Sequence, residues 1–414
     1  MGISTDINTL NSLIGPYNDM LTGMESFYLP TPMPQVISMV MAVGSRVDVT
    51  PRTIGATFGQ MTTFEINQQM PEIQRFNVNA QISAITHNGT YCYVTENFAQ
   101  QLFSLIEYKD PNYGSLQTYT SEVPIDEIRL LPYTEQLHVA DQYLLGLSVG
   151  ARSTLAATGF QLTFPLPCWI NERPGQILRA QNLDSPMQIQ LTIAPLATLI
   201  NTDATTFTAT LTLTMTFVGR ISTDEERKDC MDIINSPKGQ MMQMRDYYYQ
   251  EMQRLPAGTV GTVTIPIDVI KGPVRALDLL FRAWNDVHGS TLTPIQNEYT
   301  RFLAAYKPYS LQIKTGNEYI CQSITSRLLL TDERTYKHTK SVPEADLVRI
   351  DFADCPDLDL RYNTGYLDFN FLGKPQIELV FNTPLAVDVS FGILAKTTAF
   401  IQHARGTIRA LSSN

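Results

Sequence analysis

Apolar and polar residues alternate along most of this chain, a pattern typical of β-strands that bury one face. The clearest stretch is Thr206–Val218, where threonine occupies every second position up to Thr216 and Leu213 and Phe217 fall on the opposite face. Because threonine is β-branched and favours extended backbone, this stretch is predicted to be a strand.

The same alternation, or a short apolar run bounded by turn residues, predicts further strands. They are Gln35–Val43, Met61–Ile66, Asn79–Thr86, Gly159–Phe164, Met187–Ile193, Val263–Val269, Val274–Trp284, Ser310–Lys314, Leu347–Phe352, Gln376–Phe381 and Val387–Ala395. Pro266 has no N–H to donate, so its strand should lie at a sheet edge or at a bulge.

Helical periodicity is rare in this chain. One helix is predicted to begin at Thr223, because Thr223 and Glu226 can form a capping box and the acidic residues suit the positive end of a helix dipole. A second is predicted over Pro294–Tyr306. Strands do not alternate with helices, which argues against a parallel sheet covered by helices. The chain is therefore predicted to be all-β, with a few short helices in its loops.

The length of 414 residues indicates two domains, because single hydrophobic cores rarely grow beyond roughly 250–300 residues. The turn sequence at Gln253–Gly258 is the predicted boundary, with enough strands on each side for an eight-stranded antiparallel sandwich. The predicted organisation is an N-terminal arm (1–33), a first sandwich (34–222), a helical connector (223–257) and a second sandwich (258–414). No sequence repeat relates the two halves.

Composition narrows the function. Charged residues make up 17% of the chain, against roughly 25% in an average soluble domain. A low charge content suits extensive protein–protein contact, since interface cores are depleted in charge. The net charge of −10 argues against direct coating of nucleic acid, which needs a cationic surface. No apolar run approaches the ~18 residues of a membrane span, and no secretory signal is expected.

The five cysteines are expected to be reduced structural thiols, because their number is odd and no CxxC pair occurs. They are Cys92, Cys168, Cys230, Cys321 and Cys355.

One motif has the form of a serine nucleophile, the GxSxG sequence Gly146–Gly150 with Ser148 at its centre. Hydrolases place such a serine on a strained strand-to-helix turn, with acid and histidine partners downstream. His288, His338 and His403 do follow, but no parallel α/β pattern surrounds the motif and the segment after it shows little helical pattern. A tight turn is the favoured interpretation, and a nucleophile is the alternative.

Other candidate chemistry is weak. The segment Asp351–Asp359 holds four carboxylates that could bind calcium, but it lacks the EF-hand order. Asn88 is the first residue of a formal N-glycosylation sequence, and this segment is interpreted as a turn. The histidines have no metal-ligand spacing, and no phosphate-binding glycine motif occurs. No catalytic, cofactor-binding or metal-binding residue is therefore predicted.

Three stretches occur in a characteristic order. They are FPLPCWI (164–170) with PG (174–175) and LDSP (183–186), then DEER (224–227) after the threonine-rich strand, then GNE (316–318), GYLDFN (365–370), PQIEL (375–379) and AKTTAFI (395–401) with Gly406. In order and spacing they resemble the double jelly-roll major capsid proteins of large nucleocytoplasmic DNA viruses and of tailless, membrane-containing phages. Residues 1–150 match this family poorly.

The resemblance implies two tandem eight-stranded antiparallel jelly rolls and a structural, non-enzymatic role. It also implies a homotrimer with a pseudo-hexagonal footprint that tiles an icosahedral virion shell, assembled in the host cytoplasm. The implied partners are neighbouring capsomers and minor capsid or penton proteins. The resemblance leaves undecided whether an internal membrane lies beneath the shell.

The alternative is a carbohydrate-binding or carbohydrate-cleaving β-sandwich protein, which needs aromatic platforms and a pair of carboxylates at a defined separation. The chain holds 19 tyrosines but only 2 tryptophans, and no paired acids flank an aromatic strand. This composition makes the carbohydrate-active alternative the weaker hypothesis.

Two further expectations concern packing. Trp169 is expected to be buried near the core of the first sandwich, with Pro165 and Pro167 fixing the path of the chain there. Residues 1–33 carry an apolar stripe at helical spacing, interrupted at Gly15-Pro16, and no Lys or Arg precedes Arg46. The arm can dock on its own sandwiches, on a neighbouring subunit or on a membrane, and its acidity favours protein contact.

Overall fold

The computed structural model describes residues 53–66, 72–124, 147–171, 178–220, 228, 231–232, 234–236, 239–288, 306–325, 348–352 and 365–411. The predicted N-terminal arm (1–33), the predicted strand Gln35–Val43, the predicted helix start at Thr223 and the predicted helix Pro294–Tyr306, apart from its last residue, lie outside these residues.

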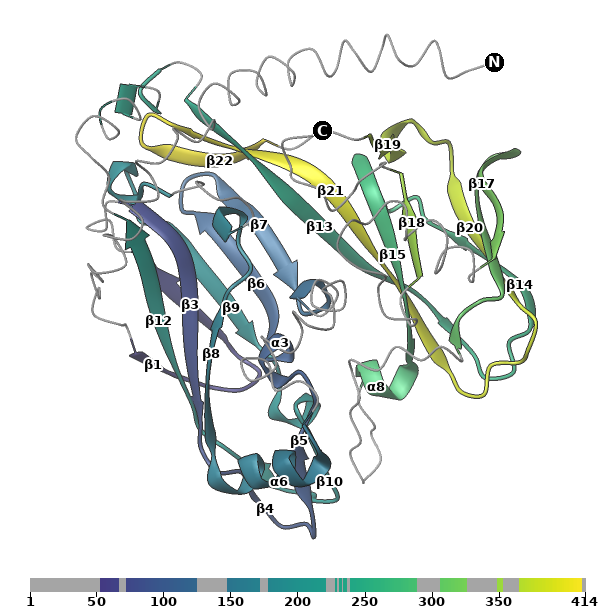
Figure 1. Cartoon of the computed structure of the whole chain (residues 1–414), viewed down its shortest axis with the longest axis horizontal. Coiled ribbons are helices and arrows are strands. Elements are labelled where there is room, and N and C mark those ends of the chain that lie inside the picture. The colour runs from purple at the N-terminus through teal and green to yellow at the C-terminus, as the bar shows by residue number, and fades with distance from the viewer. Residues whose placement is uncertain are drawn as a thin grey trace, which may run out of the picture.

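The first sandwich consists of two four-stranded antiparallel sheets (Figure 1). One sheet has the order β1 (Thr53–Ala56), β12 (Leu211–Arg220), β3 (Glu72–Ile82), β8 (Phe160–Pro165). The other has the order β2 (Met61–Glu65), β9 (Gln188–Ile193), β6 (Phe103–Asp110), β7 (Gly114–Thr120).

The second sandwich repeats this plan. One sheet has the order β13 (Gln240–Leu255), β21 (Val389–Ala404), β15 (Pro273–Ala283), β18 (Val348–Asp351), with β19 (Leu367–Asp368) beside β15 and β22 (Thr407–Leu411) beside β21. The other has the order β14 (Gly261–Pro266), β20 (Pro375–Phe381), β16 (Ser310–Thr315), β17 (Glu318–Thr325).

The two sandwiches share one topology. Numbering the main strands of each from one to eight along the chain gives the sheet orders 1-8-3-6 and 2-7-4-5 in both. In this arrangement the first strand pairs with the last and the second with the seventh, so strands distant in sequence are neighbours. The halves are therefore structural copies, although their sequences show no repeat.

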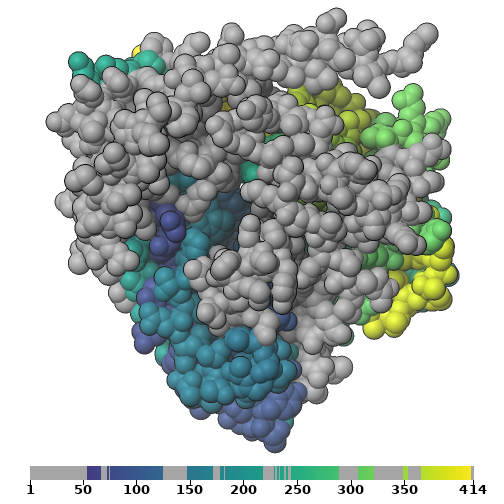
Figure 2. Space-filling view, viewed as in Figure 1, coloured from purple at the N-terminus to yellow at the C-terminus, as the bar shows by residue number. Residues whose placement is uncertain are grey.

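Short elements extend the sandwiches. At the lower end of Figure 1 the first sandwich carries β4 (Thr86–His87), β5 (Cys92–Val94), α3 (Phe98–Gln101), α6 (Val149–Thr158), β10 (Ile200–Thr202) and β11 (Phe207–Thr208). There β5 pairs with β10 and β4 with β11, and the colours of β4, β5 and α6 adjoin in the lower part of Figure 2. The remaining short helices are η1 (Trp169–Asn171), η2 (Ala180–Asn182), η3 (Leu196–Thr198), α8 (Trp284–His288) and η5 (Phe369–Phe371).

Several strand predictions are confirmed in place and in facing. In β12 the side chains of Leu211, Leu213 and Met215 are buried and the alternating threonines lie on the other face. Pro266 lies at the end of β14, which is an edge strand of its sheet, so its missing N–H costs no ladder hydrogen bond there.

The predicted domain boundary is wrong. Residues Gln240–Leu255, placed in a helical connector (223–257), form the strand β13, the first strand of the second sandwich. Nearly its whole length pairs with β21, with one irregularity after Glu251, and this long-range partner overrides local helix-forming residues. The turn at Gln253–Gly258 joins β13 to β14 rather than two domains.

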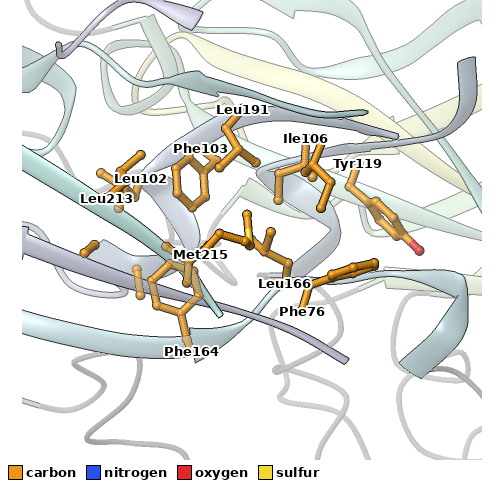
Figure 3. Packing of buried hydrophobic residues seen from close by; sticks show 14 of the residues in the cluster. Phe76, Leu102, Phe103, Ile106, Tyr119, Phe164, Leu166, Leu191, Leu213 and Met215 are labelled. Carbon is orange, nitrogen blue, oxygen red and sulfur yellow. The ribbon is translucent and has the colours of Figure 1, made fainter. Parts of the chain in front are cut away.

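Each sandwich encloses its own core. Figure 3 shows the first, where Phe76, Leu213 and Met215 of one sheet meet Phe103 and Leu191 of the other. Trp169 is fully buried in this core, as predicted. In the second core the rings of Phe281 and Phe391 stack with centroids 5.0 Å apart.

Candidate functional site

The most elaborate arrangement of side chains in the described residues lies between the two sandwiches, in a region that we call the seam. It is where β13, β15, β21 and β22 meet the first sandwich. Figure 1 shows β13 and β21 running from the second sandwich across to the first, and β22 contacts β6 and β7 there. The first core takes five buried side chains from this second half of the chain. They are Met244, Leu280, Leu394, Ile401 and Ile408.

A buried glutamine bridges the seam. Gln117 on β7 accepts a hydrogen bond from the backbone N–H of Trp169 (3.0 Å) and donates one to the carbonyl of Arg245 on β13 (2.7 Å). Beside it the rings of Tyr119 and Tyr247 lie 5.7 Å apart. Because both amide atoms are used, the Gln117 side chain is held in one orientation, and it ties the first core to the second sandwich.

A buried ion pair crosses the same seam. The guanidinium of Arg282 on β15 lies 3.4 Å from Glu122, which follows β7, and donates a hydrogen bond to the hydroxyl of Tyr249 on β13 (2.8 Å). The Arg282 and Glu122 side chains are only 1% and 6% exposed. A charge left alone in such a place is strongly destabilising, so the pair fixes how the sandwiches meet.

Further charges crosslink three strands of the second sandwich. Nε of Arg349 on β18 lies 3.3 Å from Asp278 on β15 and 3.0 Å from Asp351, and the Lys396 ammonium on β21 lies 3.2 Å from Asp278. All four side chains are buried. Since each carboxylate faces a cation, these acids are arranged for attachment between strands rather than for proton transfer.

These buried charges leave a signal in the sequence. The predicted strand Val274–Trp284 is apolar except for Arg275, Asp278 and Arg282, of which the last two lie on the face opposite Leu277 and Phe281. A strand with one apolar face and isolated charges among apolar residues on the other is covered on both faces.

The turn between β21 and β22 docks on the first sandwich. The Gly406 carbonyl accepts a hydrogen bond from the backbone N–H of Asp184 (2.7 Å), and the N–H of Arg405 donates to the Ile234 carbonyl (3.0 Å). Gly406 has a φ of 79°, and a Cβ there would overlap the Asp184 carboxylate. Glycine is therefore required both by the backbone conformation and by the close approach.

Ser148, the centre of the GxSxG motif, caps a helix. Its hydroxyl accepts a hydrogen bond from the N–H of Ala151 (3.2 Å), and its backbone is extended, with φ −62° and ψ 155°. The expectation that no helix follows was wrong, since α6 runs from Val149 to Thr158. Only Ala156 of α6 is buried, so the helix has almost no apolar periodicity to reveal it. Capping of free N–H groups accounts for the serine without catalysis.

The histidines do not join Ser148 in the described residues. Nε2 of His288 lies 2.8 Å from Glu251, and its ring stacks on Trp284 at 3.8 Å. His403 is fully buried in β21, and His338 lies outside the described residues.

Of the acidic segment Asp351–Asp359, Asp351 pairs with Arg349 and the other three acids lie outside the described residues. Among the residues that the structure describes, no group of His, Cys, Asp and Glu could hold a metal ion.

The formal glycosylation sequence is part of a closed turn. The Asn88 amide oxygen accepts hydrogen bonds from the N–H groups of Thr205 and Thr206 (both 3.0 Å), and its amide nitrogen donates to the Thr205 hydroxyl (2.9 Å). Next to it the Asp203 carboxylate accepts hydrogen bonds from Thr90, which lowers the pKa of Asp203. The turn interpretation of Asn88 is thereby confirmed.

Other predicted features are placed as follows. Cys92 and Cys168 are free and buried, as expected for structural thiols. Burial also raises the pKa of the Tyr108 phenol, whose hydroxyl donates to the Pro167 carbonyl (2.8 Å) beside Trp169. No helix in the described part of the chain is long and apolar enough to cross a membrane.

Comparison with protein families and with curated proteins finds no match to the sequence. Solved structures do match. PBCV-1 VP54, whose crystal structure was fitted into a reconstruction of the virophage Sputnik, has a TM-score of 0.65 at 12% identity, covering 88% of this chain and 97% of its own. The Faustovirus major capsid protein has a TM-score of 0.60 at 11% identity, covering 97% and 99%.

The fold is a double jelly roll. Its two sandwiches are the first and second jelly roll, and the fold implied by the sequence resemblance is confirmed. A quasi-atomic structure of the PBCV-1 virus capsid also matches, with a TM-score of 0.64 at 13% identity over 88% of this chain and 97% of that one. The double jelly roll spans the described residues from β1 to β22, and the seam is the place where its two rolls are joined.

Proposed function

We propose that this protein is the major capsid protein of an icosahedral virus, with a structural rather than an enzymatic role. The observation that carries this proposal is the repeated 1-8-3-6 and 2-7-4-5 order of the main strands in the described residues, from β1 to β21. The Faustovirus major capsid protein shares this fold along almost its entire length. Because the similar structures are capsid proteins, the carbohydrate-active alternative is not favoured.

The geometry suits a homotrimer. Each subunit offers two rolls of like topology, and three such subunits around an axis present six similar blocks with a pseudo-hexagonal outline. Closed cyclic symmetry is the common state of homo-oligomers, and a hexagonal outline can tile a shell. The buried Arg282–Glu122 pair and the Gln117 bridge support this proposal, since a tile must keep its two blocks in fixed relation.

The proposed partners are neighbouring trimers and minor capsid or penton proteins, and the proposed location is the virion after assembly in the host cytoplasm. The net charge of −10 fits contact with proteins better than contact with packaged nucleic acid. Obligate interfaces usually bury more than about 2,000 Å², so the trimer should persist at high dilution.

Sedimentation velocity of the purified full chain at micromolar concentration tests the trimer. The expected species has three times the chain mass of 46.5 kDa. Electron microscopy of material purified from the source should show icosahedral particles in which this polypeptide is abundant. A stable monomer, together with the absence of the polypeptide from any particle, would overturn the proposal.

A further inference from the structure

The end of the second jelly roll forms a latch on the first, which we define as residues 399–411. The latch comprises the last part of β21, the turn at Arg405–Gly406 and β22. Ile401 and Ile408, both fully buried, point into the first core. His403 lies two residues after Ile401 and pairs with Ile408 of β22 and with Gln240 of β13, and 0% of its surface is exposed.

The surroundings of His403 suit a neutral imidazole only. Both ring nitrogens of His403 are buried without a hydrogen bond to any described residue, and Arg179, which precedes η2, lies close enough for its positive charge to disfavour a proton on the ring. The backbone of Asn182 has the opposite, smaller effect. Arg179 is itself buried and paired with Glu72 of β3 at 3.1 Å. Among the described residues no carboxylate forms an ion pair with His403, so a proton there would add a second buried cation beside Arg179.

Other charged groups at the latch are engaged elsewhere. Asp184 approaches the turn at Gly406, and Arg409 of β22 donates to the Gln402 side chain (2.7 Å), which lies on the face opposite His403. On β13 the residue paired with His403 is the uncharged Gln240. Asp232 lies two residues before Ile234, whose carbonyl accepts the hydrogen bond from Arg405, and it is exposed.

We propose that a proton on His403 weakens the docking of the latch, so that acid shifts residues 399–411 towards a state detached from the first jelly roll. Docked, the ring is excluded from water beside a cation. Undocked, it is hydrated and takes up a proton freely. Protonation therefore favours the undocked state. This inference concerns the joint between the two rolls and holds independently of the capsid function.

The sign and the range of pH follow from the same geometry. Burial and the Arg179 charge lower the pKa of His403 from 6.5 to about 4 in the docked state. The docked state is therefore fully favoured above pH 6.5, and the advantage is lost as the pH falls from 6.5 towards 4. Linkage of these two values predicts that the ratio of docked to undocked latch falls about 20-fold between pH 7 and pH 5.

Hydrogen exchange of the full chain, corrected for the pH dependence of the intrinsic rate, tests the release. Peptides from 399–411 should lose protection about 20-fold between pH 7 and pH 5 in the wild type, while peptides from β20 in the second core keep theirs. In His403→Gln, which stays neutral, the latch should show little change over the same range. The matched control His288→Gln removes an exposed histidine and should behave as the wild type.

Equal loss of protection in the latch and in β20, or a latch that stays protected at pH 4.5, would overturn the proposal. So would an unchanged pH response in His403→Gln, because the carboxylates Glu72 and Asp184 would then account for the effect. If His403→Gln does not fold, His403→Asn, which is also neutral and smaller, takes its place, and a pH response of the latch that persists in it overturns the proposal.

Discussion

The two jelly rolls have the same strand order but differ in how they complete their cores. The described residues of the second core run from Met252 to Ala395, all within that roll's own part of the chain. The first core instead takes Met244, Ile401 and Ile408 from strands that belong to the second roll. This difference shows that dependence runs in one direction: the first roll needs the second to close its core, and the second has a core of its own.

The largest expected effect breaks this dependence directly. Ile401→Ala with Ile408→Ala removes two fully buried side chains, each worth roughly 2–5 kcal/mol. We expect the first roll to lose protection against proteolysis and hydrogen exchange in β3 and β9, although both substitutions lie on strands of the second roll. The matched control, Ile377→Ala with Leu379→Ala in β20, should weaken the second roll. Loss confined to the second roll in both variants would contradict the asymmetry.

Trp169 tests the first core at the point where it meets the seam. Trp169→Ala removes the largest fully buried side chain, which packs edge-on against Tyr108 at 5.4 Å. We expect a loss of about 3–5 kcal/mol in the free energy of unfolding, measured by denaturant titration, or failure to fold. A variant that melts within a degree or two of the wild type would place Trp169 outside the core.

The Arg282–Glu122 ion pair tests whether the seam between the two rolls is shielded from water. Arg282→Ala leaves Glu122 buried without this partner, and we expect a loss of about 3–5 kcal/mol, measured by thermal and denaturant unfolding. Combining Arg282→Met with Glu122→Leu should recover most of the loss, because neither charge then remains. Arg254→Ala, which breaks an ion pair with Asp388 that is far more exposed, should cost much less than Arg282→Ala. Equal costs for Arg282→Ala and Arg254→Ala would contradict a desolvated seam.

The smallest effect concerns the distal end of the first roll. Ser148→Ala removes the cap of α6 and should lower stability by about 1 kcal/mol, whereas Ser148→Asp should retain most of it. A fluorophosphonate probe should leave Ser148 unlabelled at neutral pH, as expected for a capping hydroxyl. A labelled Ser148 would revive the hydrolase alternative.

How far the sequence predicts this molecule depends on how local each signal is. Strand β12 is evident because its threonine face and its apolar face are both encoded within a few residues. Strand β13 is not, because its extended conformation depends on pairing with β21, more than a hundred positions later. Helix α6 was missed because a surface helix with one buried residue has no periodic stripe.

The candidate site was less predictable than the fold. Gln117, Glu122 and Arg282 are ordinary residues in sequence, and they become a seam only when two jelly rolls meet. These three residues form no contiguous motif, whereas Ser148 stands in a contiguous GxSxG sequence. The resemblance to capsid proteins supplied the fold, but no motif pointed to the joint between its halves.

The pairing of β13 with β21 has a mechanical consequence. Each strand has 16 residues, and the two pair antiparallel over nearly their full length. Side chains from both strands contribute to the first core as well as to the second. A force that pulls the rolls apart along this direction loads many backbone hydrogen bonds at once, in shear, instead of opening them one after another. We therefore expect the subunit to resist stretching along these strands far more than bending across them, and to be stiff in this direction within its assembly.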